Sequence, residues 1–190
     1  MMTARLTVVS PGALAALPDC GRRGLRRAGV PQAGALVSDW LCIANLLAGN
    51  AASHAALEFF GGGLTLRADA APLRLALAGP VQAEIVARDG TRRSVPSWRG
   101  LTLAAGETLR CPTIAGARLA YVAVHGLQVT PLAGSAATYA RAGFGQLLRS
   151  GDPLVAAVAP ASVDQCIDPP PLPDGARGAV AIRVVPGPQA

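Results

Sequence analysis

The sequence predicts a mainly β fold, an antiparallel β-barrel or sandwich that carries one principal helix. Three observations favour this class. Apolar residues make up 51% of the 190 positions, so the chain can bury a core. Glycine and proline supply 22 and 16 residues, which favours many short elements joined by turns. Most apolar runs are short and end at Gly or Pro, as is typical of an antiparallel barrel or sandwich.

The N-terminal segment begins with a predicted strand over residues 5–10, which ends at the Pro11-Gly12 turn. A second apolar segment follows, and residues 19–29 form a loop rich in glycine and arginine. Because Pro11-Gly12 interrupts the apolar stretch, the segment does not resemble a continuous signal peptide. No run reaches the roughly 18 apolar residues that a membrane span needs. A cytoplasmic protein without membrane contact is therefore expected.

The one convincing helix is expected at residues 39–48. Ser38 can cap its start, and Gly49 can close its end. Asp39 suits the positive end of the helix dipole in the first turn. Positions i, i+4 and i+7 give this helix a face that should pack on the core, made of Trp40, Ala44 and Leu47.

Strand-like runs follow the helix without another convincing helix. They are expected at residues 57–60, 64–68, 73–78, 83–88, 91–95, 100–105, 108–111 and 118–124. The strongest hairpin signal is Asp89-Gly90, which should join two neighbouring strands by a tight turn.

The composition divides the chain into three parts. Residues 1–159 are expected to form the barrel domain. Residues 160–178 are rich in proline and lack periodicity, which is typical of a linker. Residues 179–190 are interpreted as the first strand of a second half that is absent from this sequence.

All 17 basic residues are arginine, and the formal net charge is +6. Without lysine, the chain cannot form a Schiff base, act as a P-loop NTPase or carry biotin itself. The densest basic cluster comprises Arg22, Arg23, Arg26 and Arg27. This cluster is interpreted as a solvated loop, with an anion site as the alternative. Because it lacks stacking aromatic residues, no nucleic-acid partner is expected.

The four cysteines and two histidines are widely spaced, with no CxxC pair. Glu58 follows His54 by four positions, but no third ligand accompanies this pair. No metal site is therefore expected. Four cysteines in a chain of this length do not form a disulfide scaffold, so a reducing compartment is expected.

A series of short motifs runs in order along the chain. They are Ser10-Pro11-Gly12, Asp19, Gly21-Arg22, Gly24, Gly29-Val30-Pro31, Gly34, Ala44-Asn45, Gly49-Asn50, Leu57-Glu58, Gly61, Ala78-Gly79, Trp98, Gly106, Tyr121, Gly134-Ser135, Thr138 and Gly151-Asp152. Together they resemble the allophanate hydrolase subunit 2 family, also called the biotin-dependent carboxyltransferase family. The chain departs from the polar residues of that family at Pro18, Val37 and Ala136.

The resemblance implies a cyclophilin-like β-barrel and one component, the C subunit, of an ATP-dependent 5-oxoprolinase complex, which opens 5-oxoproline to glutamate. It implies partners that resemble the A and B subunits, a small-molecule substrate, and ATP used at the level of the complex. One alternative is biotin-dependent carboxyl transfer to urea, with the biotin supplied by another chain. Two further alternatives are a binding module that antagonises a kinase inhibitor, and an inactive truncated half.

The clearest local constellation is Asp19, Gly21 and Arg22. Glycine lets backbone amides approach an anion, arginine can form a bidentate pair, and Asp19 can orient Arg22 or accept a proton. Asp19 and Glu58 are the candidate catalytic carboxylates. The candidates for binding the substrate or its anion are Gly21, Arg22, Asn45, Gly134, Ser135 and Thr138. For each of these residues, a purely structural role is the alternative.

Overall fold

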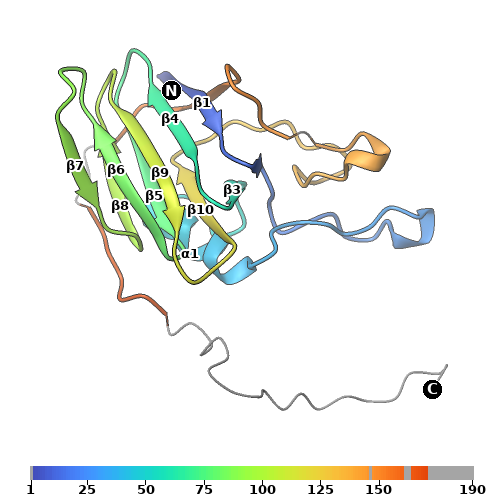
Figure 1. Ribbon diagram of the computed structural model, residues 1–190. Coiled ribbons are helices and arrows are strands. Elements are labelled where there is room, and N and C mark those ends of the chain that lie inside the picture. Colours follow the sequence, from blue (N-terminus) through green and yellow to red (C-terminus); the bar gives the residue numbers. More distant parts are fainter. Residues whose placement is uncertain (1, 146, 161–163, 171–190) are drawn as a thin grey trace, which may run out of the picture.

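The computed structural model describes residues 2–145, 147–160 and 164–170. Two antiparallel sheets pack face to face, and one α-helix covers the outside of the second sheet (Figure 1). The predicted mainly β, cyclophilin-like barrel with one principal helix is therefore confirmed. The predicted strand at residues 179–190 lies outside the described residues.

The first sheet has six strands in the order β11-β1-β4-β9-β6-β7. Their bounds are β1 (Thr3–Pro11), β4 (Leu64–Ala68), β6 (Val81–Val86), β7 (Arg92–Val95), β9 (Thr108–Ile114) and β11 (Pro153–Ala157). The second sheet has five strands in the order β2-β3-β10-β5-β8. Their bounds are β2 (Leu14–Ala16), β3 (Leu57–Phe60), β5 (Leu73–Ala78), β8 (Arg99–Leu103) and β10 (Leu119–Val124).

Most strands follow the predicted pattern. The predicted runs 57–60, 64–68 and 73–78 coincide with β3, β4 and β5. The Asp89-Gly90 turn joins β6 to β7, which pair in antiparallel fashion as expected. Strand β11 was not predicted, because it begins at a proline, which is unfavourable within a strand.

Helix α1 spans Ser38–Ala48, one residue longer than predicted. The expected N-cap is wrong: Ser38 is the first helical residue, and Val37 holds the cap position without a side-chain hydrogen bond. Gly49 closes the helix in the left-handed conformation, as expected. The Trp40 ring packs edge to face against the Trp98 ring, with their centroids 5.5 Å apart, so its packing role is confirmed.

Strands β5 and β10 are buried on both faces. Leucines such as Leu75 point into the core between the sheets, whereas Ala76 and Ala78 face α1. These small side chains let the helix lie close to the sheet. Arg74 also lies on the outer face of β5, where it is buried and ion-paired with Asp164.

The described part of the predicted linker contacts the barrel. The Gln165 carbonyl accepts a hydrogen bond from the Gly100 amide at 2.8 Å, and the Ile167 amide donates to the Trp98 carbonyl at 3.0 Å. These bonds lie along the exposed edge of β8. Over this short stretch, the segment completes a sheet edge that would otherwise be open.

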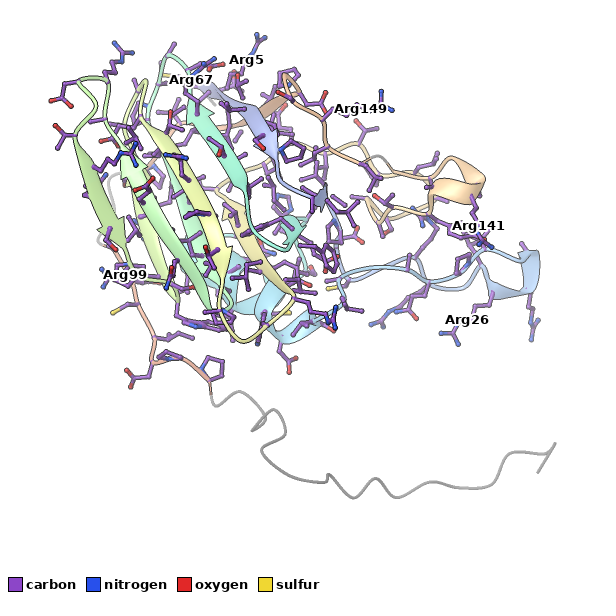
Figure 2. All side chains as sticks on the ribbon, in the orientation of Figure 1. Arg5, Arg26, Arg67, Arg99, Arg141 and Arg149 are labelled. Carbon is purple, nitrogen blue, oxygen red and sulfur yellow. The ribbon has the colours of Figure 1, made fainter. Side chains whose placement is uncertain are left out.

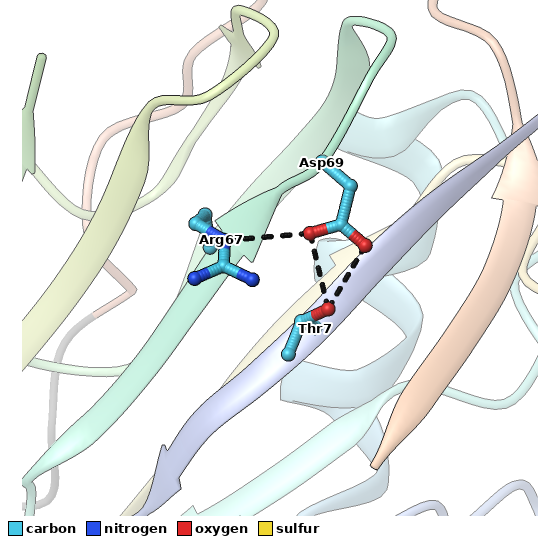
Figure 3. A network of polar contacts seen from close by, with 3 residues as sticks. All are labelled: Thr7, Arg67 and Asp69. Atoms are coloured by element: carbon cyan, nitrogen blue, oxygen red, sulfur yellow. Dashed lines mark hydrogen bonds and ion pairs between the residues drawn. The ribbon is translucent and has the colours of Figure 1, made fainter. Parts of the chain in front are cut away.

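Several charged side chains on the barrel surface have nearby partners of opposite charge. The Thr7 hydroxyl on β1 donates to the Asp69 carboxylate at 2.9 Å, and Arg67 on β4 lies 3.4 Å from the same carboxylate (Figure 3). Similar exposed pairs join Arg92 to Glu84 and Arg93 to Glu107. Exposed pairs of this kind contribute little stability, but they leave the barrel surface nearly neutral.

Two long segments project from the same side of the barrel (Figure 1). The first arm, residues 20–37, contains the short 3-10 helix η1 (Arg26–Ala28). The second arm, residues 128–147, contains η2 (Ala140–Ala142), and residue 146 is outside the description. The predicted glycine- and arginine-rich loop therefore forms much of the first arm.

Candidate functional site

The base of the first arm is a crossing of two backbone segments. The Ala35 amide donates to the Asp19 carbonyl at 2.9 Å, and the Arg22 amide donates to the Gln32 carbonyl at 2.6 Å. At Gly21, φ is +87° and a Cβ atom would lie 2.6 Å from the Ala33 carbonyl oxygen. Only glycine fits this close approach, so Gly21 shapes the base of the arm.

The Asp19 carboxylate joins the two arms. Its Oδ1 accepts hydrogen bonds from the Gly21 amide at 2.8 Å and from the Ser135 hydroxyl at 2.5 Å. Its Oδ2 accepts a hydrogen bond from the Ala136 amide at 2.8 Å. Three donors therefore hold the carboxylate in one orientation, which suits Asp19 to positioning the turn of the second arm.

The Arg22 side chain is almost fully buried, with 1% of its surface exposed. Its Nε donates to the Leu132 carbonyl at 3.0 Å, and its Nη2 donates to the Ser135 and Ala137 carbonyls at 3.1 and 2.8 Å. The guanidinium carbon lies 4.6 Å from the centre of the Phe144 ring. Most of the guanidinium is thus occupied by the second arm.

One nitrogen of Arg22 differs from the others. Nη1 is buried and has no hydrogen-bond partner among the residues that the structure describes. A buried donor without an acceptor is uncommon and costs free energy. Of the Arg22 nitrogens that were predicted to bind an anion, only Nη1 is without a partner among the described residues.

The Leu132–Ser135 turn of the second arm faces Asp19. Its central residues, Ala133 and Gly134, both have positive φ, at +53° and +80°. This combination is typical of a type I′ turn, for which a glycine at the second position is favourable. The Ser135 hydroxyl donates to Asp19 and accepts a hydrogen bond from the Ala137 amide at 3.0 Å. Thr138 follows, in contact distance of Gly145.

The structure therefore brings together six of the predicted site residues from distant parts of the sequence. They are Asp19, Gly21, Arg22, Gly134, Ser135 and Thr138. We call this group the arm junction. The sequence could not indicate that the two loops meet, because more than one hundred residues separate them.

Glu58 lies outside the arm junction, on β3. Its Oε2 accepts hydrogen bonds from the Leu36 amide at 2.8 Å and from the Tyr121 hydroxyl, and the Val37 amide donates to that hydroxyl at 3.0 Å. Burial, followed by the hydrogen bond to Glu58, raises the pKa of Tyr121 well above its usual range. Glu58 and Tyr121 together hold the chain where the first arm enters α1. The sequence motifs included Tyr121, but they gave it no role.

Asn45 lies near the other end of α1, away from the arm junction. Its Nδ2 donates to the His54 carbonyl at 2.6 Å, and its Oδ1 accepts a hydrogen bond from Asn50 Nδ2 at 3.1 Å. Asn50 in turn accepts a hydrogen bond from the Gly126 amide at 2.9 Å. These bonds tie the end of the helix to the end of β10, which is a structural role.

Two cavities border the arm junction. One of about 700 Å³ lies at the base of the second arm, with Leu17, Thr130, Leu132, Ala136, Gly145 and Leu154 in its lining. A second cavity, of about 370 Å³, is lined by Arg22, Arg23, Gly24, Arg26, Arg27 and Gln32 of the first arm. We call the second the arginine cavity. The larger cavity could hold a small molecule beside the Ser135 turn.

Neither a metal centre nor a membrane-spanning helix is found in the described part of the chain. It contains no group of three or more His, Cys, Asp and Glu side chains that could hold a metal ion. Nor does any helix there have the length and apolar character to cross a membrane.

The protein is thus a two-sheet β-barrel with one covering helix and two joined arms, and the comparisons below assign this architecture to a family. The sequence profile of the carboxyltransferase domain, subdomain A and B, matches residues 28–190, so the chain belongs to that family. Among curated proteins, the C subunit of 5-oxoprolinase from Escherichia coli K12 is 35% identical over 154 residues. That alignment covers 78% of this chain and 48% of the relative, so the chain spans about half the length of the relative.

Solved structures show the same fold. A crystal structure of TTHA0988 has a TM-score of 0.81 and 31% identity, and covers 90% of this chain and 34% of the solved one. The Kluyveromyces lactis urea carboxylase has a TM-score of 0.72 and 25% identity, over 87% of this chain and 15% of that protein. The described barrel is therefore similar to one portion of larger proteins.

Proposed function

We propose that the chain is a subunit of an ATP-dependent 5-oxoprolinase-type complex. Such a complex would open 5-oxoproline to glutamate together with cytoplasmic partners that resemble the A and B subunits. The observation that carries this proposal is the 35% identity to the C subunit of 5-oxoprolinase over 154 residues. Membership of the carboxyltransferase-domain family supports it.

In this proposal, ATP would transfer its terminal phosphoryl group to the lactam oxygen of 5-oxoproline with release of ADP. Water would then add to the same carbon and the ring C–N bond would break, and a second water would hydrolyse the resulting acyl phosphate to glutamate and phosphate. The 700 Å³ cavity beside the arm junction would receive the small substrate. Ala136 lines this cavity, and its amide is already oriented by Asp19. Asp19 would therefore act as a positioning residue for the cavity wall formed by the Ser135 turn, with Gly134 giving the turn its shape.

The remaining predicted residues have narrower roles in the proposal. Arg22 and Gly21 would hold the two arms in register, and Thr138 would support the second arm. Glu58 would fix the entry to α1 through the Leu36 amide rather than contact the substrate. Asn45 would stabilise the far end of that helix.

The test is reconstitution with A and B subunits from one bacterium, by co-expression with this chain. We expect a stable complex that produces glutamate from 5-oxoproline only when ATP is supplied. Omission of this chain should abolish the reaction. A complex that assembles but lacks activity would instead identify a binding module, and the absence of both assembly and activity would identify an inactive half.

The second candidate is biotin-dependent carboxyl transfer to urea. It is favoured by the structural similarity to urea carboxylase, with a TM-score of 0.72. Because the chain has no lysine, biotin would have to arrive on another protein. In the same reconstitution, carboxylation of urea that depends on a biotin carrier, with no effect of 5-oxoproline, would favour this candidate over the first.

A further inference from the structure

Most of the net positive charge of the chain is concentrated on the two arms. Residues 20–37 and 128–147 contain five arginines and no carboxylate. The rest of the chain contains twelve arginines and eleven carboxylates, so it is nearly neutral. Within the described residues, the ion pairs all lie outside the arms. The arms therefore carry a field that attracts anions.

The arginine cavity focuses this charge at one place. Four arginines of the first arm line its 370 Å³ volume, and none of the described residues in its lining is acidic. Arg23, Arg26 and Arg27 are exposed, so they can reach a ligand from solution. Figure 2 shows Arg26 at the far end of the first arm, away from the barrel. Like charges at this density repel one another unless an anion lies between them.

Arg22 supplies a second, independent observation. It also lines the arginine cavity, and its buried Nη1 has no acceptor among the described residues. Its other two nitrogens are held by carbonyls of the second arm, so the guanidinium is fixed in place before any ligand arrives. A fixed, desolvated donor without a partner is what a preorganised anion site contains.

The chemistry of the lining selects among anions. A single carboxylate would neutralise only one of the four guanidinium groups, whereas linked phosphoryl groups carry several negative charges and match arginine in bidentate geometry. Within the part of the chain that the structure describes, no aromatic side chain lines the cavity, so a nucleotide base finds no stacking surface there. We propose that the arginine cavity binds an anion with two or more linked phosphoryl groups and recognises the phosphates alone.

Such a site would add a place for phosphoryl groups to the proposed function, but its binding can be tested without partner subunits. The full chain is titrated by calorimetry with inorganic triphosphate in low-salt buffer free of phosphate. We expect saturable binding with one site for each chain, and ATP should bind no more tightly than inorganic triphosphate. If the titration showed no binding, the 5-oxoprolinase proposal would still be tested by the reconstitution. If the reconstitution showed no activity, the titration would still test the arginine cavity.

Matched double variants separate the cavity from general charge. Arg26→Gln with Arg27→Gln should weaken triphosphate binding by at least about tenfold, because two charge-assisted contacts are lost. Arg92→Gln with Arg93→Gln removes the same charge from an exposed arginine pair on β7, and should change the affinity less than about twofold. Melting temperatures confirm that both variants fold.

Several results would overturn the proposal. They are the absence of saturable triphosphate binding, an equal loss in both double variants, and binding of succinate as tight as that of triphosphate. Binding of a single-stranded oligonucleotide more tightly than triphosphate would instead identify a nucleic-acid surface.

Discussion

The barrel and the two arms are stabilised by different kinds of interaction. In the barrel, buried leucines and other apolar residues from both sheets share one core, and several surface charges are paired. At the arm junction, two side chains, Asp19 and Arg22, make most of the hydrogen bonds between the arms. Stability in the barrel is therefore distributed, whereas the order of the arms depends on very few residues.

The largest expected effect comes from the barrel core. Leu75→Ala removes a fully buried side chain, so the free energy of unfolding should fall by about 2–5 kcal/mol. Leu132→Ala in the second arm removes an exposed side chain and should change the free energy of unfolding by less than about 0.5 kcal/mol. Denaturant unfolding measures both. Equal losses would contradict the contrast between barrel and arms.

The next effect concerns the arm junction. In Arg22→Lys, an ammonium group cannot reproduce the planar fork that reaches the Leu132, Ser135 and Ala137 carbonyls. We expect the free energy that is needed to separate the two arms to fall by about 1.5–3 kcal/mol, while the barrel remains folded. Amide hydrogen exchange should therefore increase across residues 132–137 and remain unchanged in β5 and β10.

The control for this substitution is its neighbour. Arg23 is exposed, so Arg23→Lys should leave exchange in the second arm as it is in the wild type. If both substitutions had the same effect, the hydrogen bonds of Arg22 would not be the reason that the arms are ordered.

The smallest effect is expected at the joint between the first arm and α1. Because the pKa of Tyr121 is raised in the folded state, its hydroxyl stays protonated there while the unfolded chain ionises above about pH 10. The stability that this shift contributes is complete below that pH and falls as the pH rises, by about 1.4 kcal/mol at pH 11. Tyr121→Phe should be less stable than the wild type at pH 7, and this difference should narrow by pH 11. A constant difference would contradict the prediction.

Much of the barrel could be predicted from its sequence, because local patterns determine it. Alternating apolar residues and the Asp89-Gly90 turn predicted the paired strands β6 and β7. The alternation failed to indicate β11, a short strand beginning with Pro153 whose place depends on pairing with distant β1. Ser38 was wrongly predicted as the N-cap, because the prediction used only the local preference of serine for that position. The start of the helix is instead fixed by Glu58 and Tyr121, which accept hydrogen bonds from the Leu36 and Val37 amides.

The candidate site was predictable only in part. The motifs that carry the family resemblance singled out Gly21 and the Gly134-Ser135 turn, both of which form tight backbone turns or crossings. The burial of Arg22 could not be predicted, since its partners are backbone carbonyls of a loop far away in the sequence, which carry no residue signature. Nor could the separation of Asn45 from the arm junction be predicted. The first arm enters α1 at its start, whereas Asn45 lies near its end and bonds to the His54 carbonyl.

The position of the arm junction has a consequence for how this protein can change over evolution. Asp19 and Arg22 lie on the outgoing side of the first arm, close to the barrel, and their partners Gln32 and Ala35 lie on the returning side. The residues between Arg23 and Pro31 contribute to none of these bonds. A change in the length, sequence or charge of the tip would therefore leave these bonds in place, so the tip and the junction can change independently.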